Sequence, residues 1–160
     1  MKIKIYTTGG SIDKFYSTKD SDFIIGEPTI EQILTDSNVT VDYEIESLIK
    51  KDSLDLDDGD RNFIFEKVSA EPTRHIVITH GTDTMIQTAQ VLTNIAEKVI
   101  VLTGAMQPSA FRISDAAFNI GGAILSVQTL PPGVYIAMNG RIFNPQEAVK
   151  NLVMDRFEDT

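Results

Sequence analysis

The sequence contains no cysteine, only two histidines and few basic residues, and each shortage excludes a class of function. Without cysteine the chain has no disulfide, thiolate nucleophile or cysteine-ligated metal. His75 and His80 do not by themselves form a histidine-rich metal site. Lysine and arginine number 14 against 23 acidic residues, and the resulting net charge of −9 repels nucleic acid phosphates and anionic lipid. We therefore expect neither nucleic acid nor a membrane surface as a partner.

A long apolar run and an amino-terminal targeting pattern are also missing. No apolar stretch approaches the ~20 residues that a transmembrane helix requires. A strand pattern begins at Met1–Ile5 and leaves no room for a signal peptide. No linker or repeat divides the 160 residues. We expect one cytoplasmic domain over residues 1–160.

Short β-rich runs alternate along the chain with stretches that carry apolar residues at helical spacing. This alternation is typical of a parallel α/β sheet, and we predict a three-layer α/β sandwich with a mostly parallel sheet of five strands. The expected strands are 3–7, 41–48, 75–79, 99–103 and 134–138, and the expected helices are 29–34, 57–69, 84–95 and 114–130.

Polar segments rich in small residues follow all five predicted strands. They are 8–11, 52–55, 80–84, 104–109 and 139–141. The carboxyl ends of parallel strands share one edge of the sheet, where ligands bind in such folds. Ser11, directly after two glycines, is the candidate nucleophile. Ordinary turns, and helix capping by Thr82 and Asp83, are the simpler alternative.

Three of these segments are similar to motifs of a known protein family. Thr8-Gly9-Gly10-Ser11-Ile12, Thr79-His80-Gly81-Thr82-Asp83-Thr84, and Thr103-Gly104-Ala105-Met106 with Pro108, taken in order, resemble successive motifs of the L-asparaginase family of bacterial-type amidohydrolases. The resemblance covers essentially the whole chain but only the family's amino-terminal domain, so we expect the carboxyl-terminal domain to be absent. It implies hydrolysis of the side-chain amide of asparagine, and often of glutamine. The family uses a threonine nucleophile that a Thr-Lys-Asp group activates, with no metal or cofactor.

The resemblance also implies roles for individual residues. Ser11 falls on the nucleophilic threonine and keeps its hydroxyl. Thr82 falls on the residue near the attacking water, and Asp83 on the residue that also binds the substrate amino group. Ser53 falls on the serine that binds the substrate carboxylate. The implied site consists of Gly10, Ser11, Ser53, Gly81, Thr82 and Asp83, with amides near Ser11 or Gly81 receiving the oxyanion.

Two polar groups of the family's substrate site are replaced in this sequence. Phe23 stands where the family's flexible loop has a tyrosine, with Tyr16 seven residues earlier. Leu54 replaces the polar residue that follows the substrate-binding serine. We expect one substrate contact and one hydroxyl to be lost.

The activating lysine is expected near the end of the domain, where Glu158 or Thr160 stands in this chain. Neither a carboxylate nor a hydroxyl replaces an ammonium that stabilises a deprotonated threonine. Lys150, Lys14 and Lys51 are the remaining candidates.

The resulting prediction is an asparaginase-like amidohydrolase that acts on asparagine or a related small amide. Residues from a neighbouring subunit complete the pocket in the family, so we expect a homodimer. The alternative is an inactive member that binds a small amino acid as a sensor or interaction module. Phosphate or nucleotide binding by Gly9-Gly10 is a weaker hypothesis, because the Gly-Lys-Ser/Thr of a P-loop is missing.

Overall fold

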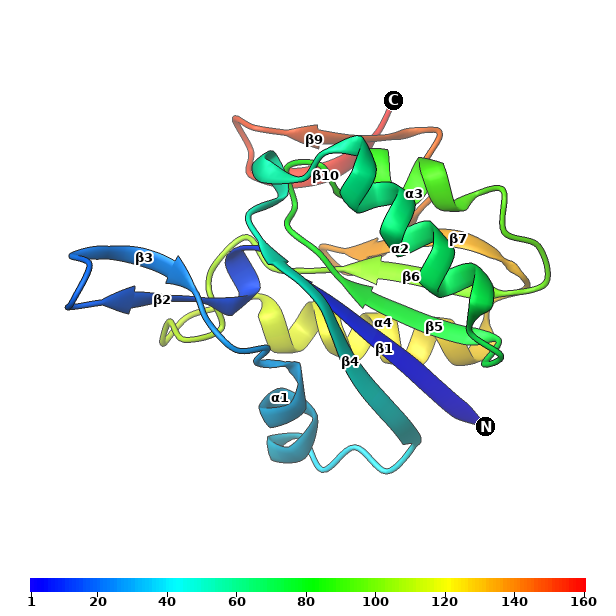
Figure 1. Ribbon diagram of the computed structural model, residues 1–160, viewed down its shortest axis with the longest axis horizontal. Helices are drawn as coiled ribbons and strands as arrows, with labels where there is room; N and C mark the ends of the chain where they lie inside the picture. The colour runs from blue at the N-terminus through cyan, green and yellow to red at the C-terminus, as the bar shows by residue number, and fades with distance from the viewer.

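A six-stranded β-sheet forms the centre of the computed structural model, which describes residues 1–160. The strand order is β4-β1-β5-β6-β7-β8 (Figure 1). The strands are β1 (Lys2–Gly9), β4 (Asp42–Lys51), β5 (His75–Thr79), β6 (Val99–Thr103), β7 (Gly133–Met138) and β8 (Arg141–Phe143). Neighbouring strands are parallel except β8, which runs antiparallel to β7.

The five predicted strands are therefore present, but the prediction of a five-stranded sheet was one strand short. Asn139 and Gly140 join β7 to β8, with φ angles of 54° and 74°. Two consecutive residues with positive φ make the tight turn that connects antiparallel strands, and Asn-Gly is the pair that favours it. Residues 139–141 thus form a hairpin turn and the start of a strand rather than an open loop.

Helices cover both faces of the sheet, which confirms the three-layer sandwich. The helices are α1 (Ile30–Asp36), α2 (Asp58–Ala70), α3 (Met85–Leu92) and α4 (Ala116–Thr129). Buried side chains of α2 and α3 pack on one face, and those of α1 and α4 pack on the other (Figure 1). Side chains of β5 alternate between the two cores, with Ile76 and Ile78 in one and Val77 in the other. Burial on both faces explains why the central strands β5 and β6 read as nearly continuous apolar runs.

Two small hairpins lie outside the sheet, and neither was predicted. The first pairs β2 (Lys14–Ser17) with β3 (Asp22–Ile25) and projects from the body at the left of Figure 1. The second pairs β9 (Ala148–Asn151) with β10 (Arg156–Asp159). Isolated two-stranded hairpins are marginal in water, so tertiary contacts rather than local sequence hold them. No helix of the protein combines the length and apolar character needed to cross a bilayer.

Candidate active site

Two glycines and a serine bring the loops after β1, β4 and β5 into direct contact. A Cβ built on Gly10 would lie 2.4 Å from the Cα atom of Gly81, and one built on Gly81 would lie 2.6 Å from the Cβ atom of Ser53. Gly81 is therefore packed between the other two residues. Ser11 and Thr82 each follow one of the touching glycines, so the backbone places both at the same edge of the sheet.

The turn before Ser11 depends on the conformational freedom of glycine. Gly9 and Gly10 have φ angles of 93° and 87°, which side chains with a Cβ rarely adopt. The amide of Gly10 donates to the carbonyl oxygen of Lys51 at 3.0 Å, which fixes the turn against the end of β4. Ser11 then begins a single 3₁₀ turn, Ser11–Asp13.

A lysine completes the polar group expected beside Ser11. The Nζ atom of Lys150 donates to Thr82 Oγ1 and to Asp83 Oδ1, both at 2.8 Å. Thr82 is buried, and the side chain of Lys150 is only 14% exposed. A hydroxyl, an ammonium and a carboxylate thus form one hydrogen-bonded set at the carboxyl end of the sheet.

The position of Lys150 corrects the expectation that Glu158 or Thr160 occupies the lysine place. Lys150 lies on β9 directly opposite Phe157 of β10. Phe157 is buried in the core, and its amide donates to Asn139 Oδ1 at 2.9 Å. These contacts hold the hairpin against the sheet. Glu158 instead accepts hydrogen bonds from Asn151 and Arg156.

The other two lysine candidates bind elsewhere. Lys14 Nζ lies 2.6 Å from Asp52 Oδ2, and Lys51 Nζ lies 2.8 Å from Asp60 Oδ2. Burial opposes the charge of Asp52, but hydrogen bonds from Lys14 and from the Leu54 amide lower its pKa. The charge of Lys150 lowers the pKa of Asp52 further.

Capping does not account for Thr82 and Asp83. The residue that precedes the first turn of α3 is Thr84, and its side chain makes no capping hydrogen bond. Thr84 instead binds Ser53: its amide donates to Ser53 Oγ at 3.3 Å, and its Oγ1 donates to the Ser53 carbonyl oxygen at 2.8 Å. Ser53 is buried and accepts with its hydroxyl oxygen, so its hydroxyl proton remains available for donation.

His80 is a buried support beneath the site, a role that the sequence alone did not predict. Its Nδ1 lies 2.7 Å from the Gly81 carbonyl oxygen, and its Nε2 lies 2.8 Å from Thr88 Oγ1. Because a carbonyl only accepts, Nδ1 carries the proton and Nε2 accepts from Thr88 in the neutral ring. Burial lowers the pKa of His80 to about 4.

The neutral His80 is expected to make folding stability depend on pH. An unfolded histidine binds its proton near pH 6.5, so the unfolded state binds more protons between pH 6.5 and about 4. The contribution of neutral His80 to the free energy of unfolding is fully present above pH 6.5 and is lost as the pH falls to about 4. This contribution amounts to about 3 kcal/mol. Denaturant unfolding at several pH values between 7 and 5 measures this dependence of the unfolding free energy on pH. Most carboxylates titrate below that pH range. The slope is expected to persist in His75→Gln and to vanish in His80→Gln; an unchanged slope in His80→Gln contradicts this assignment.

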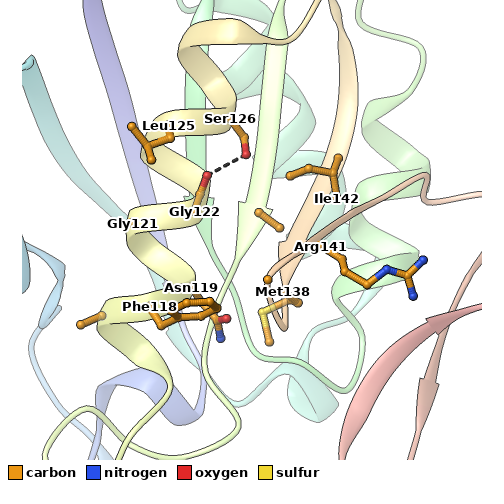
Figure 2. A pocket seen from close by; sticks show the side chains of 12 residues that line it. Phe118, Asn119, Gly121, Gly122, Leu125, Ser126, Met138, Arg141 and Ile142 are labelled. Carbon is orange, nitrogen blue, oxygen red and sulfur yellow. Dashed lines mark hydrogen bonds between the residues drawn. The ribbon is translucent and has the colours of Figure 1, made fainter.

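No group of three or more histidine, cysteine, aspartate or glutamate side chains is placed to hold a metal ion. A cavity of about 550 Å³ lies elsewhere, between α4 and the β7–β8 hairpin. Figure 2 shows its lining, with Phe118, Leu125 and Ile142 around two glycines. Its one charged side chain, Arg141, pairs with Asp159. The cavity therefore lacks the converging polar groups of a catalytic centre.

Comparison with known proteins finds a matching family model and similar relatives. Residues 2–157 match the family described as asparaginase, N-terminal. The chain is 30% identical over 92% of its length to the "Probable L-asparaginase periplasmic" of Haemophilus influenzae, and 29% identical over 96% to "L-asparaginase 2" of Escherichia coli. It covers 46% and 47% of these two relatives, so it spans about half of their length.

Solved structures show the same fold. The thermostable L-asparaginase from Thermococcus kodakarensis is similar with a TM-score of 0.85 and 26% identity. The probable cytoplasmic L-asparaginase from Campylobacter jejuni is similar with a TM-score of 0.81 and 30% identity. Each similarity covers 99% of this chain and 51% of the other.

Proposed function

The chain belongs to the asparaginase family, and on that premise we propose that it is an amidohydrolase that converts the side-chain amide of asparagine, or a related small amide, to the acid and ammonia. One observation carries the proposal: Lys150 joins Thr82 and Asp83 beside the turn that presents Ser11. A hydroxyl nucleophile needs a neighbouring group that accepts its proton. Within the Thr82–Lys150–Asp83 set the Asp83 carboxylate is the group that accepts a proton, since the Lys150 ammonium only donates.

In the proposed reaction, Ser11 Oγ attacks the amide carbon, the carbon–nitrogen bond breaks, and ammonia leaves with the hydroxyl proton. Water then hydrolyses the ester. Thr82 is placed to orient that water, while the Lys150 ammonium, which donates to Thr82 Oγ1, stabilises negative charge that develops on the reacting oxygen beside it. Asp83 holds the ammonium in place from the other side.

Replacing Ser11 by alanine is the direct test. Ser11→Ala is expected to lower ammonia release from asparagine at least about a thousandfold, because no other group in the proposed mechanism forms the acyl intermediate. The measurement is a coupled ammonia assay over asparagine, glutamine and their simple derivatives, with Ser126→Ala on α4 as a control. If the unmodified protein releases no ammonia from any of them, the proposal fails.

We further propose that the protein acts as a cytoplasmic homodimer. Leu152 and Val153 are highly exposed directly after the strand that carries Lys150, and apolar side chains beside a site favour a covering partner. The similar asparaginase of Campylobacter jejuni is described as cytoplasmic, which supports that location, whereas the relative from Haemophilus influenzae is named as periplasmic.

A further inference from the structure

Three aromatic rings form a row at the carboxyl edge of the sheet. The ring centroids of Tyr16 and Phe23 lie 5.4 Å apart, and those of Phe23 and Phe111 lie 5.6 Å apart, both in edge-on contact. The three residues are 54%, 43% and 40% exposed. Half of this apolar surface therefore faces solvent, where a bound apolar group would displace water.

Two rings of the row and Lys14 lie on one face of the β2–β3 hairpin. Tyr16 is directly opposite Phe23, and Lys14 shares their face because it is two residues before Tyr16. Lys14 reaches Asp52 after β4, whereas Phe23 reaches Phe111 after β6. Since β1 and β5 lie between β4 and β6, this face spans the ends of the strands that carry the site.

Both segments of the row are anchored close to Ser11. The amide of Ser109, two residues before Phe111, donates to the Ile12 carbonyl oxygen at 3.1 Å. At the base of the hairpin, the amide of Gly26 donates to the Asp13 carbonyl oxygen at 2.9 Å. Tyr16 lies two residues beyond Lys14, about 7 Å along the strand. The row therefore stands on two segments that are hydrogen-bonded to the turn that begins at Ser11.

We propose that Tyr16, Phe23 and Phe111 form an apolar subsite for the amine portion of the substrate, so that amides whose nitrogen carries an aryl group are favoured over the primary amide of asparagine. The negative charge of Asp83, which follows β5, suits the amino group at the amino acid end of the substrate. The aromatic row suits the uncharged end. This inference rests on the proposed amidohydrolase function.

The reaction on such a substrate breaks the same bond. Water supplies the hydroxyl of the new carboxylic acid and a proton of the released arylamine, so no oxidant, reductant or metal enters the balance. The probe is the β-(4-nitroanilide) of L-aspartate, whose amine portion is an aromatic ring, compared with L-asparagine, whose amine portion is ammonia.

The test compares kcat/KM for the two substrates in Phe23→Ala, Phe111→Ala and the control Phe63→Ala. Phe63 is 43% exposed, like Phe23, but lies on α2. Each Phe→Ala change in the row is expected to lower kcat/KM for the anilide on the order of tenfold more than kcat/KM for asparagine, and the control is expected to change neither by more than twofold. Equal losses on both substrates, or no loss on the anilide, overturn the subsite.

A binding measurement separates this inference from the proposed function. Calorimetry on the Ser11→Ala protein reports binding of the anilide without turnover. If the unmodified protein hydrolyses neither substrate, the amidohydrolase proposal fails, while tighter binding of anilide than asparagine, weakened by Phe23→Ala, supports the subsite. Anilide binding no tighter than asparagine binding overturns the subsite even if ammonia release is normal.

Discussion

Replacing Lys150 by methionine is expected to lower the rate of asparagine hydrolysis at least about a thousandfold while the protein stays folded. Methionine fills similar space but removes the charge that contacts Thr82 and Asp83. A preorganised charge beside a reacting oxygen lowers the activation free energy by several kcal/mol. A partly exposed ion pair contributes only about 1 kcal/mol or less to stability. The measurement is kcat at saturating asparagine, with the unfolding midpoint recorded for the same sample.

Lys51→Met is the matched control for this prediction. Lys51 also pairs with a carboxylate, Asp60, but on the surface beside α2. Its kcat is expected to stay within twofold of the unmodified protein. A Lys150→Met protein that keeps more than a tenth of the original kcat shows that Lys150 does not activate the reaction.

Replacing Gly10 by alanine is expected to destabilise the protein by at least about 3 kcal/mol and to abolish activity. The added Cβ would lie 2.4 Å from Gly81 Cα and 2.5 Å from Gly81 N. Both are backbone atoms, so no side-chain rotation relieves the clash. The φ of 87° adds strain for any residue with a side chain. Denaturant unfolding and the ammonia assay measure the two effects.

Gly121→Ala provides the control of opposite sign. Gly121 lies within α4 beside the cavity of Figure 2, and a Cβ built there meets no atom within 4 Å. Alanine in a helix is more favourable than glycine by up to about 1 kcal/mol, so this variant is expected to be slightly stabilised and fully active. A Gly10→Ala protein as stable and active as Gly121→Ala contradicts the close packing of the two loops.

The central strands β5 and β6 could be predicted because they are buried on both faces. The runs His75–Thr79 and Val99–Thr103 are continuous apolar segments, and both form strands with those bounds. A strand in the middle of a parallel sheet is covered by helices on both faces, and its residues are therefore mostly apolar. A short continuous apolar run in the sequence thus indicates a central strand. The β2–β3 and β9–β10 strands are short and mixed in polarity, and local pattern does not distinguish them from loops. The turn at Asn139-Gly140 carried a usable hairpin signal.

The residues of the candidate site also differ in how far local sequence could predict them. Gly10, Ser11, Ser53, Gly81, Thr82 and Asp83 stand in short motifs after strands, and topology alone brings the ends of those strands to one edge. Lys150 stands in a segment without such a motif. Its one local signal is alternation, since the buried Ala148 and Lys150 share a face of β9.

The sequence by itself determined five of the six strands of the sheet, its covering helices and the loop that carries the candidate nucleophile, because hydrophobic periodicity and glycine-containing turns are local properties. Only the tertiary structure decided which lysine meets Thr82. Phe157 is separated from Asn139 by 18 positions, yet their hydrogen bond and the burial of the Phe157 ring hold the hairpin that carries Lys150. A contact between distant segments depends on how the whole core packs, and no local pattern records it.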